Sequence, residues 1–74
     1  MAEIKYEIVE NCGVISKSIK GWSKELNLVK WNDRDAKFDI REWSQDHEKI
    51  GKGITLTKDE VKELKKILDN LNLE

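Results

Sequence analysis

Residues 53–71 read GITLTKDEVKELKKILDNL, and this stretch decides the fold because it contains a complete helix start. Thr57 and Glu60 have the spacing of a capping box. In such a box the threonine oxygen accepts a hydrogen bond from the third helical N–H, and the glutamate accepts one from the threonine N–H. Apolar side chains then recur at helical spacing: Val61, Leu64, Ile67, Leu68 and Leu71. The stretch therefore predicts an amphipathic helix of about four turns.

The sequence before this helix is typical of strands. Residues 4–8 alternate between apolar and charged side chains, which is the period of a strand with one buried face. A turn or a bulge is expected at residues 11–13, where Asn and Gly occur. Further strands are predicted at residues 23–31, 37–44 and 51–57, joined by a polar turn and a polar loop. Strands followed by one helix make the chain an α+β protein, with the helix against one face of an antiparallel sheet of about four strands.

The chain has room for one domain, residues 1–74, and its composition excludes several classes of protein. No run of about 18 apolar residues is present, which excludes a membrane-spanning helix. The N-terminus lacks the basic and apolar segments of a secretory signal. Cys12 is the single cysteine and cannot form an internal disulfide, so we expect a reducing compartment, the cytoplasm.

Charge is unevenly distributed along the chain, whose net charge is −1 at pH 7. Residues 1–16 carry −2 and residues 58–74 carry −1, whereas residues 17–57 carry +2. The same middle segment holds all three tryptophans. Basic residues interleaved with aromatic ones favour a nucleic-acid-binding surface.

Alternation assigns the side chains of the strand at 37–44 to two faces. Phe38 and Ile40 point to one side, which we expect to be the core. The other side is expected to point outward and carries Lys37, Asp39, Arg41 and Trp43. A ring flanked by cations is the surface on which single-stranded nucleic acid stacks its bases, while the cations meet the phosphates. The same row is equally suited to closing a dimer interface.

The other two tryptophans lie near the ends of the strand at 23–31. Trp22 and Trp31 occur among three lysines, Lys20, Lys24 and Lys30. If this strand pairs with the next through the turn at 32–36, Trp31 shares a surface with Trp43. Core packing is the alternative role for each ring. The segment Gly51-Lys52-Gly53 either lets a ligand approach the backbone or only lets the strand bend.

The remaining residues predict no chemistry of their own. His47 is expected to be an exposed loop residue, because ligands for a metal site are not near it in the sequence. Cys12 has no neighbour that would lower the pKa of its thiol and is interpreted as a packing residue. We find no catalytic constellation, so the sequence predicts no enzyme, no metal and no cofactor.

Two segments carry a resemblance to a known family. They are Asp39-Ile40-Arg41-Glu42-Trp43 and, after a loop, Lys52-Gly53-Ile54-Thr55-Leu56 before the helix. In combination they resemble the C-terminal domain of positive cofactor four, a transcriptional coactivator, and Lys20-Gly21-Trp22 resembles its small bacterial members of the YdbC type. The resemblance covers about residues 20–68. It implies a curved antiparallel sheet, a homodimer formed largely through the helix at 58–71, and single-stranded DNA lying across the sheet without sequence readout.

The resemblance also implies which residues contact DNA. Arg41 and Lys52 match DNA-contacting cations of the family, and Trp43 matches an aromatic residue at the end of its strand. Lys37 is added from its outward position alone. The full predicted set is Lys24, Lys30, Trp31, Lys37, Arg41, Trp43 and Lys52, extended by Lys20, Trp22 and Lys49. The expected function is sequence-independent binding of single-stranded DNA in transcription, replication or repair. The alternatives are RNA binding and a protein interaction through the same Trp-rich face.

Overall fold

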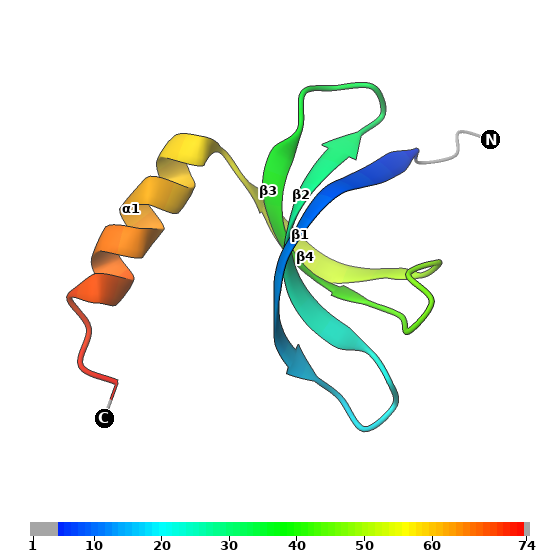
Figure 1. Cartoon of the computed structure of the whole chain (residues 1–74), viewed down its shortest axis with the longest axis horizontal. Helices are drawn as coiled ribbons and strands as arrows, with labels where there is room; N and C mark the ends of the chain where they lie inside the picture. The colour runs from blue at the N-terminus through cyan, green and yellow to red at the C-terminus, as the bar shows by residue number, and fades with distance from the viewer. Residues whose placement is uncertain (1–4, 74) are drawn as a thin grey trace.

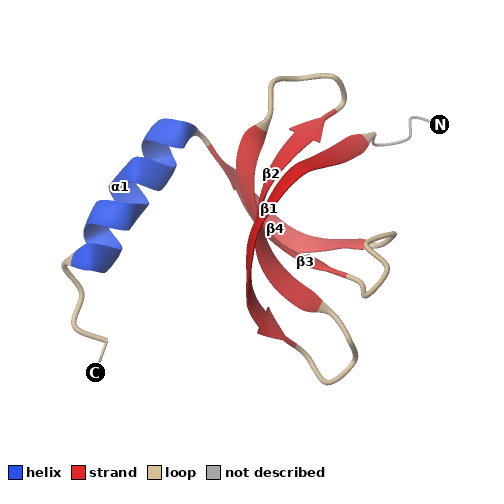
Figure 2. Cartoon of the chain, in the orientation of Figure 1, coloured by secondary structure: helices blue, strands red, loops and turns tan. Residues whose placement is uncertain are grey.

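The computed structural model describes residues 5–73, and within them an antiparallel sheet is followed by one helix (Figures 1 and 2). The elements are β1 (Tyr6–Lys17), β2 (Ser23–Trp31), β3 (Lys37–Trp43), β4 (Ile50–Leu56) and α1 (Lys58–Asp69). The strands are neighbours in sequence order, β1-β2-β3-β4, and each pair is antiparallel. The predicted α+β class and order of elements are confirmed.

The β2–β3 hairpin owes its tight turn to two residues with left-handed backbones. Asn32 has φ 48° and Asp33 has φ 65°, and the Arg34 N–H donates to the Trp31 carbonyl oxygen at 2.8 Å. Two positive φ angles at the central positions match a type I′ turn, whose twist suits a hairpin. Asn and Asp tolerate this conformation better than other side chains do. The turn begins the loop at 32–36, and the pairing of β2 with β3 starts at Val29 and Lys37.

β1 is one continuous strand with three bulges. The pairing with β2 shifts register between Ile8 and Glu10, between Asn11 and Gly13, and between Val14 and Ser16. The expected irregularity near residue 12 is therefore a bulge and not a turn; Ile4, the first residue of the expected strand, lies outside the described residues. Each bulge bends its strand and increases the local twist. Repeated bulges explain why β1 curls around the sheet, whose strands cross steeply in Figure 1.

The helix begins with the predicted capping box. Glu60 N donates to Thr57 Oγ1 at 3.2 Å, and Thr57 N donates to Glu60 Oε1 at 2.8 Å. The helix ends at Asp69, about three turns long at 3.6 residues per turn, so Leu71 lies beyond it. The expected packing of the helix over one sheet face is not present in the single chain. None of its residues is buried by the described residues 5–73, and it stands apart from the sheet in Figure 1.

The buried interior lies on the face that we expected to be exposed. We call it the inner face; in β2 and β3 it consists of the odd-numbered residues from Ser23 to Trp31 and from Lys37 to Trp43. Trp43, Val29, Asn27 and Asp39 on this face are fully buried. The even-numbered residues of β2 and β3, together with Lys52, Ile54 and Leu56 of β4, form the outer face, where Phe38 and Ile40 are only half-buried.

The helix and the loop at 44–49 explain this reversal. The loop folds back over the inner face, where His47 contacts Trp43 and Glu25, whereas α1 leaves the outer face largely open.

Within residues 5–73 the structure contains no helix long and apolar enough to cross a membrane.

Candidate nucleic-acid interface

Three aromatic rings form a cluster on the inner face. The Trp31 and Trp43 rings are nearly parallel, 9° apart with centroids 6.4 Å apart, and Tyr6 from β1 packs against both at 5.9 and 5.3 Å. The expectation that Trp31 and Trp43 share a surface is confirmed. The expectation that Trp43 points into solvent is wrong, because its exposed fraction is 0%. Trp31 is half-buried and is the ring of this pair that remains accessible.

Arg41 is fixed over the Trp31 ring. Its Cζ lies 5.2 Å from the ring centroid, within the range of a cation–π interaction. Arg41 Nε and Nη2 donate to the two carboxylate oxygens of Asp39 at 3.0 and 3.1 Å, and Nη1 donates to the Gly51 carbonyl at 3.1 Å. Thr55 Oγ1 donates to Asp39 as well, at 3.1 Å. The guanidinium is therefore held in one orientation by a fully buried carboxylate.

Gly53 permits the close approach of β4 to β3 beside Arg41. A Cβ at this position would lie 2.4 Å from the Ile40 carbonyl oxygen and 2.6 Å from Arg41 Cα. No side chain fits there without moving the backbone of β3. β4 also bulges, since its register with β3 shifts between the Arg41 and Trp43 pairings. The glycines of residues 51–53 thus allow close packing between the strands, which agrees with the alternative that this segment only lets the strand bend.

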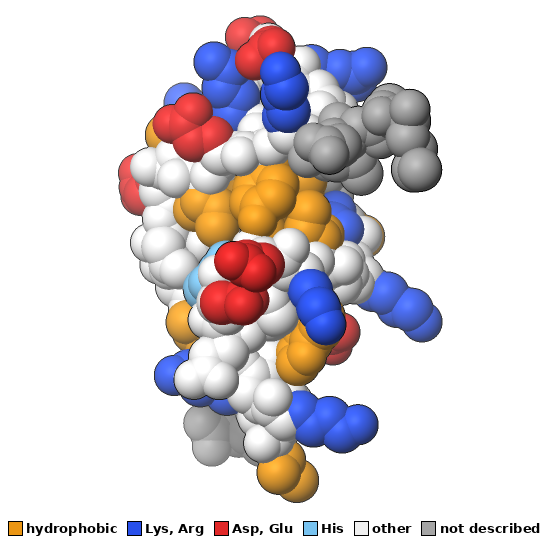
Figure 3. All heavy atoms as spheres, turned by 90° about the vertical axis from the view of Figure 1, so that its right-hand side faces the viewer, with side chains coloured by type: hydrophobic (Ala, Val, Ile, Leu, Met, Phe, Trp, Pro, Cys, Tyr) orange, Lys and Arg blue, Asp and Glu red, His pale blue; other side chains and the backbone are white. Residues whose placement is uncertain are grey.

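A hollow of about 560 Å³ opens beside Trp31 and Arg41. The side chains around it are Trp31, Asn32, Arg34, Asp35, Lys37, Arg41, Ile50 and Thr55. Three cations and one carboxylate surround an aromatic wall, so the hollow is basic and partly apolar. Figure 3 looks onto this side of the molecule, where hydrophobic side chains form the centre and charged ones surround it. Such a surface suits an unstacked base with phosphates beside it.

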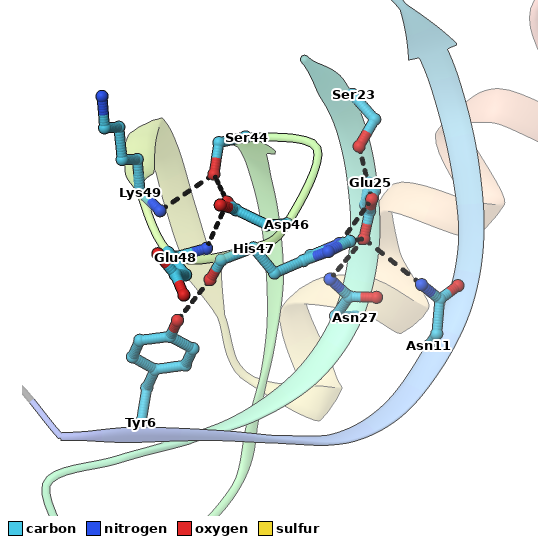
Figure 4. A network of polar contacts seen from close by, with 10 residues as sticks. All are labelled: Tyr6, Asn11, Ser23, Glu25, Asn27, Ser44, Asp46, His47, Glu48 and Lys49. Atoms are coloured by element: carbon cyan, nitrogen blue, oxygen red, sulfur yellow. Dashed lines mark hydrogen bonds and ion pairs between the residues drawn. The ribbon is translucent and has the colours of Figure 1, made fainter. Parts of the chain in front are cut away.

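A buried carboxylate ties the loop at 44–49 to the sheet (Figure 4). His47 has φ 62°, and its Nε2 lies 2.9 Å from Oε2 of Glu25 on β2. Glu25 also accepts hydrogen bonds from Ser23, Asn27 and Asn11, the latter two at 3.1 and 3.2 Å. Tyr6 closes the loop from the other side, since its hydroxyl donates to the His47 carbonyl. The expectation that His47 is an exposed loop residue is wrong, because it is half-buried and fastens the loop over Trp43.

The same contacts set the protonation of Glu25. Burial alone raises the pKa of this carboxyl, but the hydrogen bonds from Ser23, Asn27 and His47 and the charge of His47 act in the opposite direction. The net result is a pKa below the ordinary value for glutamate. Glu25 is therefore ionised in the folded protein at neutral pH.

The other predicted site residues do not share the inner face. Lys24 and Lys52 belong to the outer face, where they border one hollow together with Glu42. Lys30 is exposed and pairs in register with Glu7 of β1. The extension predicted at Lys20, Trp22 and Lys49 comes together at the opposite end of the sheet from Trp31. The structure therefore brings Trp31, Lys37 and Arg41 together around one hollow, with Trp43 buried against Trp31, and separates the rest.

Several residues of the hollow were missed by the sequence analysis. Arg34 closes the turn at Asn32 and Asp33, within the turn at 32–36 that the sequence predicted, but its place beside the hollow had no signal. Ile50 and Thr55 reach the hollow through the register of β4, for which no short-range signal exists.

No metal site accompanies this surface. Within residues 5–73 there is no group of three or more His, Cys, Asp and Glu side chains placed to hold a metal ion. Cys12 is an exposed residue. The loss of some water around its thiol, together with the charge of Glu10, still raises the pKa of the thiol above its ordinary value.

Comparison with known proteins agrees with this geometry. Residues 18–67 match the protein family described as Transcriptional Coactivator p15 (PC4). An uncharacterised protein of Treponema pallidum (strain Nichols) is 44% identical over 72 residues, covering 97% of this chain and 85% of that protein. The family description supports a nucleic-acid-binding, coactivator-like role for the domain. With most of its length matched, the chain belongs to the PC4 family of transcriptional coactivators.

Proposed function

We propose that the chain binds single-stranded DNA, largely without regard to sequence, in the hollow beside Trp31. One base packs against the part of the half-buried Trp31 ring that Trp43 and Arg41 leave exposed, and Arg34, Lys37 and Arg41 contact the neighbouring phosphates. The observation that carries this proposal is the fixed position of Arg41 over an accessible tryptophan. Trp43 stays in the proposal as the buried ring that supports Trp31 from beneath.

The preference for a single strand follows from the shape and chemistry of the hollow. Stacking on a protein ring requires a base whose flat face is free, and in a duplex both faces are covered by neighbouring base pairs. Every base offers such a face, and phosphates are the same for all sequences, so this mode of binding has little sequence preference. The interaction does not by itself distinguish DNA from RNA.

We further propose that the active form is a homodimer, acting in the cytoplasm in transcription regulation, replication or repair. Ile54 on the outer face and Ile67, Leu68 and Leu71 in or just after α1 are 48–56% exposed. Side chains of this kind are costly to leave in water. A second copy that covers the outer face and the apolar side of α1 removes them from solvent and leaves the inner-face hollow open.

Titration with oligo-dT tests the proposal, with tryptophan fluorescence and the anisotropy of a labelled strand as readouts. We expect quenching by the single strand, little response to duplex, and an affinity that falls steeply with salt because phosphate contacts release counterions. Trp31→Ala should weaken binding about tenfold, which lies within the range for a stacked base. Parallel titration with oligo-U measures the preference between DNA and RNA.

Absence of binding at low salt would contradict the proposal. The same face would then be assigned to a protein partner, which is the alternative function for a surface of this composition.

A further inference from the structure

A second hollow lies at the end of the sheet away from Trp31. It measures about 550 Å³ and lies between the β1–β2 loop and the loop at 44–49. Its lining consists of Lys20, Trp22, Ser44, Gln45, Asp46 and Lys49. Trp22 precedes β2 and Trp31 ends it. The Trp22 ring lies near Gly51, where the side chain of Glu42 on the outer face is also close, whereas Trp31 belongs to the inner face. The two tryptophans therefore line different hollows.

Trp22 is held in place by its own loop and by β4. Its N–H donates to Ser18 Oγ at 3.1 Å, and its carbonyl accepts from the Ser18 N–H at 2.7 Å. Gly21 provides the left-handed backbone, φ 87°, that this loop requires. The ring lies against Gly51, where a Cβ would be only 3.1 Å from ring atom Cζ3. Trp22 is thus a half-buried ring in a fixed position beside an open hollow.

The charges around Trp22 favour an anionic ligand. Lys20 and Lys49 both border this hollow. Asp46 is the one carboxylate of its lining, which leaves an excess of positive charge. Asp46 is in addition engaged within its loop, accepting from Ser44 Oγ at 2.7 Å and from the Glu48 N–H at 3.0 Å.

We propose that Trp22, Lys20 and Lys49 form a second nucleotide subsite for the same single strand, with a base stacked on Trp22 and the two lysines on adjacent phosphates. This inference rests on the proposed function. Gln45 borders this hollow and also one beneath the loop at 44–49, lined by Lys17 and His47 among others. The Trp31 hollow and the Trp22 hollow have no lining residue in common. Occupying both therefore requires a strand of several nucleotides.

Strand length separates the two subsites experimentally. Affinity is measured for labelled oligo-dT of about 5 and about 16 nucleotides, near the two ends of the range of known site sizes. Trp22→Ala should weaken binding of the longer strand about tenfold and leave that of the shorter strand within about twofold, because the Trp31 hollow still binds it. Trp31→Ala should weaken both. Lys62→Ala, an exposed lysine of α1, is the control and should change neither.

The lysines give a second test that does not depend on whether Trp22→Ala folds. The double variant Lys20→Ala/Lys49→Ala removes two phosphate contacts, so the slope of log affinity against log salt for the longer strand should fall by about 1.4. If circular dichroism shows that Trp22→Ala is unfolded, the double lysine variant and Trp22→Phe test the subsite instead. Trp22→Phe keeps an aromatic ring on which a base can stack, so it should bind the longer strand more tightly than the double lysine variant does.

The outcomes distinguish this inference from the proposed function. If Trp22→Ala and the lysine variant bind the longer strand as tightly as the parent protein while Trp31→Ala does not, the second subsite is wrong and the proposed function stands. If the parent protein binds neither strand at low salt, both fail together. A photocrosslink from iodouracil in the longer strand to the peptide containing Trp22 would support the subsite directly.

Discussion

Trp43 is the residue on which the inner face depends, because its ring is fully buried beneath Trp31, Tyr6 and His47. Removing a buried aromatic ring leaves a cavity that a small domain cannot refill. Trp43→Ala should therefore lower the free energy of unfolding by about 3–5 kcal/mol, measured by urea denaturation. Trp22→Ala is the matched control, since its ring is only half-buried, and it should cost less. Equal stability of Trp43→Ala and the parent protein would show that the ring is not part of the core.

Asp39 tests whether the position of Arg41 or merely its charge matters for binding. Asp39 is fully buried and holds Arg41 with two hydrogen bonds. Asp39→Asn removes a negative charge, so charge alone predicts tighter binding of single-stranded DNA. We expect weaker binding, because the guanidinium loses its fixed orientation over Trp31. Asp35→Asn, at an exposed carboxylate of the same hollow, is the control and should strengthen binding. Anisotropy titrations at one salt concentration show whether each variant binds single-stranded DNA more weakly or more tightly than the parent protein.

At the scale of elements, the loop at 44–49 and β2 are joined through Glu25, and this contact makes stability depend on pH. The pKa of Glu25 is lower in the folded protein than its ordinary value of about 4.3. Its contribution to stability is therefore present above the unfolded pKa and is lost as the pH falls through the folded pKa.

Glu25→Gln should remove this part of the acid transition and cost about 1–3 kcal/mol at neutral pH, since buried hydrogen bonds to a charged acceptor are lost. Thermal unfolding between pH 3 and pH 7 measures both effects, the range being chosen to bracket an ordinary carboxyl pKa of about 4. Glu63→Gln on the exposed side of α1 is the control and should leave the profile unchanged. An unchanged profile for Glu25→Gln would contradict the assignment.

The elements also show what could be predicted from the sequence and what could not. The capping box at Thr57 and Glu60 is a local signal, and so the helix start was predicted correctly. Alternation correctly placed Trp43 and Phe38 on opposite faces of β3, because that depends on backbone geometry alone. Which face is covered depends on three bulges in β1 and on a loop that folds back over the sheet. Apart from the Asn and Gly at residues 11–13, these features have no short-range signature, and so the burial of Trp43 was predicted wrongly.

The same limit applies to the candidate site. Trp31, Lys37 and Arg41 share a face by alternation and were predicted together. The contact of His47 with Glu25 joins residues 22 positions apart and depends on the left-handed backbone of His47, which its residue type does not signal. Long-range contacts of this kind decide which of the predicted lysines reach the hollow.

At the scale of the whole molecule, the exposed apolar side of α1 supports the proposed homodimer. The helix has an apolar side, yet residues such as Leu68 remain about half exposed and none is buried. The outer face of the sheet, with Ile54, is similarly open. Because a helix of this length is marginal in water without tertiary packing, its apolar side must gain contacts for α1 to be stable. A homodimer in which helices and outer faces cover each other provides those contacts.

Leu68→Asp should convert the proposed dimer into a monomer, because it places a charge in the apolar contact. Sedimentation equilibrium measures the mass, with Lys62→Gln on the polar side of α1 as a control that makes the same change in net charge. We expect the control to remain dimeric and Leu68→Asp to lose helix content as well, since the unpaired helix lacks its packing. Binding to a short strand should survive in this variant, because the Trp31 hollow is formed within one chain. A parent protein that sediments as a monomer with a stable helix would overturn the dimer and leave the single-chain hollow as the binding unit.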